Sequence, residues 1–175
     1  MSKVILYIAA SLDGYIAGRN DDLSWLDPYQ GRGEDYGYSD FITTIGTAIM
    51  GSRTYEQSLK FPEQMIHGLK TYVLSERLFP LLPDADVKFY SGNLEALVAK
   101  ITKENKKNIW IVGGGQVVAS FFHAGLVDEV IHFVVPVLLN EGIPLYPPHG
   151  KEISLRLVEA VPYKSGIVKL HYVPK

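Results

Sequence analysis

Three consecutive glycines between an apolar run and a helical pattern constrain this chain most. Residues 109–112 (Ile-Trp-Ile-Val) are apolar and rich in β-forming side chains, and Gly113, Gly114 and Gly115 follow them directly. Val118 and Phe121 then begin an apolar pattern with helical spacing. This order predicts a buried strand, a tight turn and a helix. The turn has two interpretations: a phosphate cradle of backbone N–H groups at a helix N-terminus, or a crowded strand-to-helix connection.

Composition limits the classes of protein that the chain can belong to. With 175 residues and 47% hydrophobic content, it is long and apolar enough for one domain with a substantial core. A net charge of −2 gives no broad basic surface, so we expect no nucleic-acid partner. The absence of cysteine excludes disulfides and thiolate chemistry. The apolar run at 4–10 is too short to span a membrane, so we expect a cytoplasmic protein without a membrane partner.

Strand and helix patterns alternate along the chain. Strands are predicted at 4–9, 47–50, 71–74, 87–90, 109–112 and 129–135, and an antiparallel hairpin at 155–161 and 167–173. Helices are predicted after the caps Ser39 and Asn93, after Ser52, weakly at 64–68, and after Gly115. Gly46 is expected to end the first helix. The pattern predicts a single α/β domain over 1–175, with a mostly parallel central sheet flanked by helices and a C-terminal antiparallel hairpin.

Three polar turns follow predicted parallel strands. They are Gly51-Ser52-Arg53-Thr54, Ser75-Glu76-Arg77 and the triple glycine continuing to Gln116. Ligands of open α/β sheets bind at the carboxyl ends of the strands, where these turns meet. Arginines, hydroxyls and glycine N–H groups are suited to phosphates, so the three turns together predict a nucleotide site.

Other motifs are missing. The triple glycine is followed by no Gly-Lys-Ser/Thr, which excludes a phosphate-binding loop of the Walker type. It also lacks the final glycine or alanine and the later acidic residue of a Rossmann fingerprint. The histidines are scattered, so we expect no metal site. No Gly-x-Ser-x-Gly elbow is present.

Several segments resemble the dihydrofolate-reductase-like proteins. They are 10–17 (Ala-Ser-Leu-Asp-Gly-Tyr-Ile-Ala), 49–56 (Ile-Met-Gly-Ser-Arg-Thr-Tyr-Glu) and 112–115 (Val-Gly-Gly-Gly). Residues 125–130 and 141–145 further resemble the C-terminal reductase domain of the bifunctional riboflavin-biosynthesis deaminase-reductase. The deaminase half has no counterpart in this sequence. The resemblance spans nearly the whole chain.

The resemblance implies a reductase that uses NADPH. The turn Gly51, Ser52, Arg53 and Thr54 would hold cofactor phosphates, and Ser75 and Arg77 would lie near the 2′-phosphate of NADPH. The remaining implied cofactor contacts near the nicotinamide are Ala9, Ala10, Ile16, Gly113 and Gly114, and those at the pyrophosphate are Gly115 and Gln116. Val112 is a further implied cofactor contact.

The resemblance also suggests an acceptor site beneath the polar, aromatic segment 21–38. Trp25 resembles the loop tryptophan of dihydrofolate reductases, although Ser24 precedes it here in place of proline, and Phe41 is a second substrate-binding candidate. Asp13 and Asp40 are candidates to orient the substrate or relay a proton. The expected reaction is hydride transfer to a small pterin- or pyrimidine-like heterocycle or a carbonyl compound.

Two other functions stay open from the sequence alone. One is an NADP(H)-binding module without turnover, and the other is a structural or interaction protein that dimerises through its edge hairpin. A homodimer is expected by resemblance in either case. Protection by NADPH distinguishes the structural protein from the other two.

Overall fold

The computed structural model describes residues 2–30, 33–60, 68–148, 150 and 152–175. Strands alternate with helices as the sequence predicts, and the segment 19–30 adds two 3₁₀ helices. The elements in chain order are β1 (Val4–Ser11), β2 (Tyr15–Ala17), η1 (Arg19–Asp21), η2 (Ser24–Tyr29), α1 (Tyr38–Thr44), β3 (Ile45–Gly51), α2 (Ser52–Lys60), β4 (Lys70–Leu74), β5 (Val87–Tyr90), α3 (Leu94–Glu104), β6 (Asn108–Gly113), α4 (Gly115–His123), β7 (Glu129–Val135), β8 (Ile143–Pro144), β9 (Leu155–Pro162) and β10 (Val168–Pro174).

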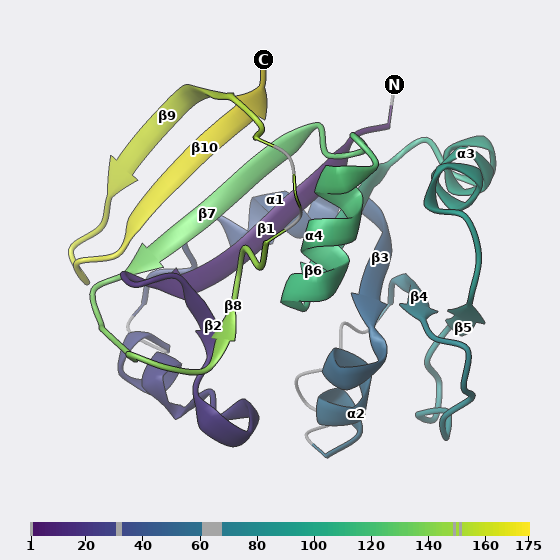
Figure 1. The fold of residues 1–175 in the computed structure, drawn as a ribbon, viewed down its shortest axis with the longest axis horizontal. Helices are drawn as coiled ribbons and strands as arrows, with labels where there is room; N and C mark the ends of the chain where they lie inside the picture. Colours follow the sequence, from purple (N-terminus) through teal and green to yellow (C-terminus); the bar gives the residue numbers. More distant parts are fainter. Residues whose placement is uncertain (1, 31–32, 61–67, 149, 151) are drawn as a thin grey trace.

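An eight-stranded sheet in the order β5-β4-β3-β6-β1-β7-β10-β9 forms the centre (Figure 1). The first six strands in this order pair in parallel. β10 pairs antiparallel with β7 and with β9, so the C-terminal hairpin extends one edge. The prediction of a mostly parallel sheet with a terminal antiparallel hairpin is confirmed.

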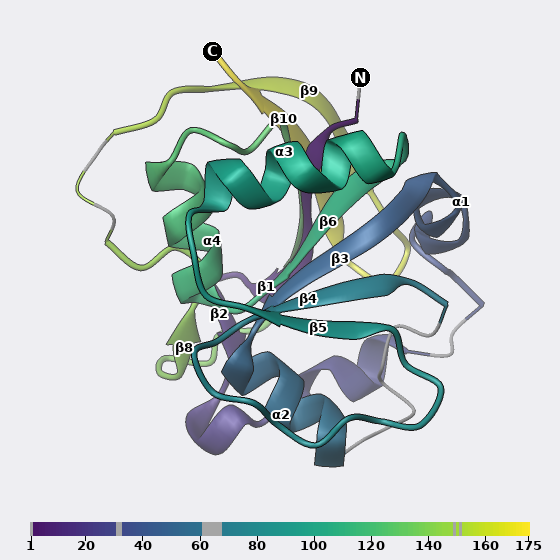
Figure 2. The same ribbon diagram turned by 90° about the vertical axis from the view of Figure 1, so that its right-hand side faces the viewer.

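Alternate side chains of β1 enter two different cores. Leu6 is fully buried against α3 and α4, in a cluster with Leu97 and Phe121. Ile5 faces the other way and packs with Phe41 of α1 and with Trp110. Helices therefore cover both faces of the sheet (Figure 2). This explains why the sequence of β1 is continuously apolar rather than alternating.

The helix starts show which cap predictions were right. The Asn93 side chain accepts a hydrogen bond from Ala96 N (2.8 Å) and caps α3, as predicted. Ser39 does not cap α1, because that helix begins earlier, after Gly37. The carboxylate of Asp35 accepts the N–H groups of Gly37 (2.9 Å) and Ser39 (3.1 Å) instead. The expected stop at Gly46 is also wrong, since β3 already begins at Ile45.

A second, two-stranded sheet was not predicted. β2 and β8 pair antiparallel beside the carboxyl end of β1, and Leu145 N donates to the Gly14 carbonyl (2.8 Å). These two strands are too short for a period-two pattern to be recognised in the sequence. The weak helix predicted at 64–68 lies, apart from Gly68, outside the described residues.

Candidate active site

A cavity of about 730 Å³ opens at the carboxyl ends of the central strands. Segments from β1, β3, β6, β7 and the 19–38 connection line it. It brings together eleven of the sequence-predicted residues: Ala9, Ile16, Gly51, Ser52, Arg53, Thr54, Val112, Gly113, Gly114, Gly115 and Gln116. The strand-end turns after β3 and β6 therefore face one space, as their positions in the sequence suggested.

Two helix N-termini line one end of this cavity. The turn Gly51 to Thr54 enters α2, and Gly114 is the N-cap of α4. A Cβ built on Gly114 would lie 3.7 Å from Thr54 Oγ1 and 3.8 Å from Ile16 Cδ1, so this glycine keeps open the space between the two turns. Gly113 has φ of 128°, which favours glycine. Backbone N–H groups, hydroxyls and two helix dipoles together make this a suitable end for anions. We call it the glycine end.

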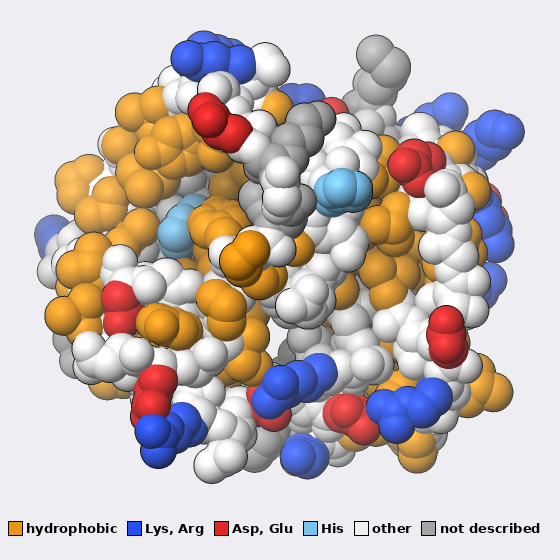
Figure 3. Space-filling view, in the orientation of Figure 1, with side chains coloured by type: hydrophobic (Ala, Val, Ile, Leu, Met, Phe, Trp, Pro, Cys, Tyr) orange, Lys and Arg blue, Asp and Glu red, His pale blue; other side chains and the backbone are white. Residues whose placement is uncertain are grey.

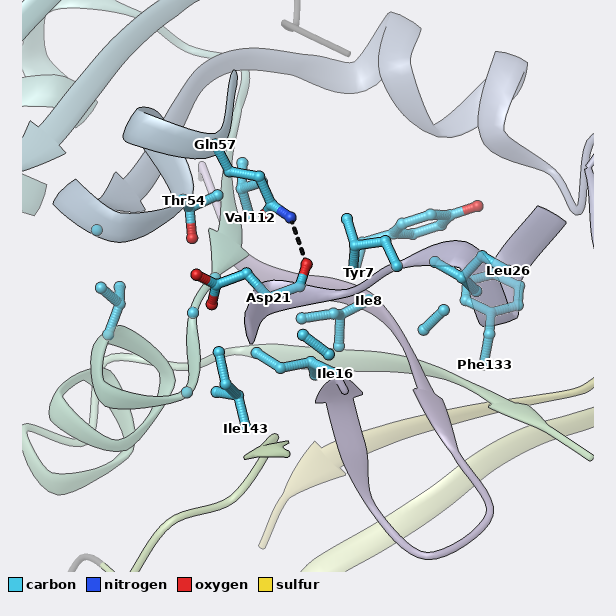
Figure 4. Close-up of a pocket in the computed structure, with 18 of the residues that line it drawn as sticks. Tyr7, Ile8, Ile16, Asp21, Leu26, Thr54, Gln57, Val112, Phe133 and Ile143 are labelled. Carbon is cyan, nitrogen blue, oxygen red and sulfur yellow. Dashed lines mark hydrogen bonds between the residues drawn. The ribbon is translucent and has the colours of Figure 1, made fainter. Parts of the chain in front are cut away.

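An acidic side chain already occupies part of the glycine end. Asp21 Oδ1 lies 2.7 Å from Arg53 Nε, and Gln57 Nε2 donates to the Asp21 carbonyl (2.8 Å). Figure 4 shows the Asp21 carboxylate directed toward Thr54, at the start of α2. These contacts hold η1 against α2 at the glycine end of the cavity.

The opposite end is aromatic, and sequence reasoning missed most of it. Tyr7 and Phe133 lie at this end in Figure 4, with Leu26 beside them and Thr54 on the far side. Burial raises the pKa of Tyr7, so its phenol stays protonated at neutral pH, and its hydroxyl donates to the Tyr36 carbonyl (3.3 Å). The aromatic end, as we call it, has the following lining: Tyr7, Leu23, Leu26, Tyr29, Gln30, Asp35, Tyr36, Tyr38, Trp110, Phe133, Val135 and Ile167.

Three predicted contact residues lie behind the lining. Ala10 is fully buried on the opposite side of β1, among the residues packed under α3 and α4. Trp25 is 9% exposed, because η2 turns its ring toward Phe133. Phe41 stacks on Tyr7 with ring centroids 4.0 Å apart. Trp25 and Phe41 therefore support the rings that line the cavity and do not line it themselves.

The two predicted catalytic carboxylates also lie outside the lining. Asp13 accepts hydrogen bonds from the Ser11 hydroxyl (2.6 Å), Leu139 N (3.1 Å) and Asn140 N (2.7 Å). The Ser11 hydroxyl, followed by these N–H groups, lowers the pKa of Asp13, so its carboxylate joins the end of β1 to the 139–140 turn as a charged acceptor. Asp40 is exposed in the first turn of α1.

The third predicted turn lies beyond the cavity, at the end of β4. Ser75 Oγ accepts the Arg77 N–H (2.9 Å), and Arg77 is exposed with its guanidinium carbon 5.3 Å from the Phe79 ring centroid. Leu74, the residue before this turn, lines the cavity. The Ser75–Arg77 turn is thus next to the glycine end without lining it.

Some missed residues left a signal in the sequence. The segment 29–38 is dense in tyrosine, and polar aromatic residues in a long connection are typical of a binding loop. No sequence signal pointed to Asp21, because its partner Arg53 lies far along the chain and only the fold brings the two side chains together. Among the described residues, no three histidine or acidic side chains are placed to hold a metal ion. None of the described helices has the length and apolar character needed to cross a bilayer.

The chain matches known proteins over nearly its full length. The family model of the RibD C-terminal domain matches residues 2–169. The uncharacterized protein YwjB of Bacillus subtilis (strain 168) is 38% identical over 171 residues, which cover 98% of this chain and 97% of that protein.

Solved structures share the fold. A putative riboflavin biosynthesis protein from Shewanella sp. PV-4 superposes with a TM-score of 0.89 at 25% identity, covering 99% of each chain. The Thermotoga maritima diaminohydroxyphosphoribosylaminopyrimidine deaminase/5-amino-6-(5-phosphoribosylamino)uracil reductase gives 0.72 at 15% identity, over 99% of this chain and 57% of that one. Dihydrofolate reductase from Enterococcus faecalis, complexed with NADP(H), gives 0.69 at 16%, over 99% and 96%. With its dihydrofolate-reductase-like fold, this chain belongs to the RibD C-terminal domain family.

Proposed function

We propose that residues 1–175 form one reductase domain that uses NADPH to reduce a small planar heterocycle or carbonyl compound. One observation carries the proposal: the first turn of α2 and the glycine turn before α4 face each other across a single cavity. Two such anion-binding helix starts at the glycine end, with the aromatic end beyond them, suit a dinucleotide whose reactive ring meets a second ring. The reductase names of the structural relatives support the same reaction class.

The donor set fits the cofactor. Ser52 and Thr54 provide hydroxyls, Arg53 provides a charged donor and Gly114 leaves room for a ligand between Thr54 and Ile16. When bound, NADPH supplies a hydride, and a proton from water completes the two-electron reduction of the acceptor. We assign the proton to water because Asp13 and Asp40 lie outside the cavity lining.

Thermal unfolding with added nucleotide tests cofactor binding. At about 100 times Kd, NADPH stabilises the native state by roughly 2.7 kcal/mol, which raises Tm by on the order of 5–11 °C for a chain of this size. Ser75 and Arg77 are our proposed 2′-phosphate contacts, so NADH should protect less, and the difference should vanish in Arg77→Ala. Failure of NADPH to raise Tm would refute the cofactor assignment. Equal protection by the two nucleotides would remove Arg77 from it.

Turnover separates a reductase from a binding module. A screen of heterocycles and carbonyl compounds, followed by the loss of NADPH absorbance at 340 nm, should find an acceptor for the wild type. The matched variant Gly114→Val should fold and lose both protection and turnover. Protection without turnover across the whole screen would favour the binding module.

We further propose that the chain forms a homodimer. β9 is an edge strand of the sheet, and its Leu157 and Val158 side chains are 50% and 48% exposed. Figure 3 shows hydrophobic side chains gathered over the β9 and β10 side of the molecule. Light scattering should give twice the 19.5 kDa chain mass, and Leu157→Lys should shift the measured mass toward that of a single chain. A monomeric wild type would refute this.

A further inference from the structure

The aromatic end of the cavity differs chemically from the glycine end. Most of its walls are rings and aliphatic side chains, with Tyr7 stacked on Phe41 behind it and Trp110 edge-on to Tyr7 (84°). Two of the tyrosine hydroxyls there donate to the protein itself: Tyr36 Oη to the Tyr29 carbonyl (3.1 Å), and Tyr7 Oη to the Tyr36 carbonyl. Such walls favour a flat ring, because aromatic faces stack on π-systems with little demand for hydrogen bonds.

Positive charge is concentrated at the other end of the cavity. Among the lining residues that the structure describes, Arg53 is the basic side chain, and it lies at the glycine end paired with Asp21. Lys169, on β10, pairs with Glu159 (2.8 Å) and does not line the cavity. A phosphate or carboxylate in the aromatic end would therefore lose hydration without gaining a cationic partner from these residues, which is costly.

The aromatic end instead carries a negative charge. Asp35 lines it, and hydrogen bonds from the backbone N–H of Gly37, together with those from Ser39, lower the pKa of its carboxyl. The carboxylate is thus ionised at neutral pH and held in place at the start of α1. An anionic group nearby would be repelled.

We propose that the acceptor is an uncharged, flat ring compound that carries neither phosphate nor carboxylate. The proposal rests on the reductase function above and names its substrate class. It separates this chain from the Thermotoga maritima relative, whose name specifies a phosphoribosylamino substrate. The same fold would then serve a neutral acceptor, because the described lining of the aromatic end holds aromatic side chains and Asp35 where a phosphate would need cations.

Binding of matched ligand pairs to the full chain tests the proposal. Isothermal titration calorimetry compares riboflavin with riboflavin 5′-phosphate, and pterin with pterin-6-carboxylate, each with and without NADP⁺. The neutral member of each pair should bind at least tenfold more tightly. Equal or tighter binding of the charged members overturns the proposal. Failure of both neutral rings to bind at concentrations up to their solubility limits overturns it as well.

Two pairs of variants locate the effect. Asp35→Asn keeps an acceptor for the N–H groups at the start of α1 but removes the charge, so the preference for the neutral ligand should fall about threefold or more. The control Asp27→Asn changes an exposed residue outside the lining and should leave this preference unchanged. Tyr38→Ala should weaken ring binding about tenfold. Tyr146→Ala, similarly exposed (44% against 38%) and outside the lining, should not.

The outcomes separate this proposal from the reductase function. An unchanged preference in Asp35→Asn, or equal losses in both tyrosine variants, would show that the aromatic end does not select the ligand. Thermal melts of each variant exclude unfolding as the cause. Protection by NADPH is measured without an acceptor, so its loss would refute the cofactor assignment, whereas preference for a charged ring with intact protection would refute the substrate class alone.

Discussion

Replacing Asp21 by asparagine should strengthen NADPH binding. The Asp21 carboxylate pairs with Arg53 at 2.7 Å, at the position where we propose a cofactor phosphate. A phosphate must therefore displace a carboxylate that is already there. Asparagine removes the charge but tolerates the left-handed backbone of this residue (φ 64°). The hydrogen bond from Gln57 goes to the Asp21 carbonyl and is retained.

The size of the effect follows from exposure. The Arg53 and Asp21 side chains are 66% and 32% exposed, so solvent screens the pair and it contributes about 0.2–1 kcal/mol. Its removal should lower the Kd for NADPH by up to about fivefold. The unliganded variant should lose no more than this amount of stability. The gain in affinity should shrink at high salt, because both the pair and the competing phosphate are screened.

Calorimetric titration with NADPH at low and high salt measures this directly. Asp22→Asn is the matched control, since its carboxylate is adjacent in sequence, lies outside the lining and accepts bonds from Ser24. The control should bind like the wild type. An unchanged or weakened affinity in Asp21→Asn would mean that the carboxylate and the phosphates do not share a position, and the reasoning would fail.

Three further substitutions have defined outcomes. Gly114→Ala should fold normally but bind NADPH at least tenfold less tightly. Gly115→Ala places a Cβ 2.3 Å from the Pro144 carbonyl and should lower the free energy of unfolding by about 1–3 kcal/mol, or Tm by roughly 2–12 °C. Equal melting temperatures of Gly115→Ala and the wild type would contradict this. Burial lowers the pKa of His132 to about 4, so the stability that depends on its neutral form is complete above pH 6.5 and is lost as the pH falls toward 4. This loss of stability is at most about 3 kcal/mol. Urea unfolding at several pH values should show it in the wild type and not in His132→Phe. Parallel curves of stability against pH for the two proteins would disprove the prediction.

The sequence predicted the sheet and the glycine end because both depend on local patterns. Apolar runs, glycines and the Asn93 cap mark the elements themselves, whereas the strand order, with β1 between β6 and β7, was not predicted. The turn after β3 and the turn after β6 meet because neighbouring parallel strands end at one edge of the sheet.

The aromatic end depends on orientation, which local patterns do not define. Trp25 and Leu26 are adjacent in η2, and the rotation of this helix about its axis decides which of them faces the cavity. The sequence contains no signal that distinguishes them. Tyr7 belongs to a strand with both faces buried, so its side was equally undetermined. Ser39 failed as a cap because α1 already begins at Tyr38, where Asp35, earlier in the chain, accepts the N–H groups of Gly37 and of Ser39 itself.

The central position of β1 has a consequence for how the chain is made. β1 leaves the ribosome before β6 and β7, which are its neighbours in the sheet, and Trp110, which donates to the Tyr7 carbonyl, lies 103 residues later. Contacts so distant in sequence form slowly, and an apolar strand with two unpaired edges invites pairing with other chains. The middle of the sheet is therefore closed late in synthesis, and nascent chains that stop before residue 108 should be prone to aggregation.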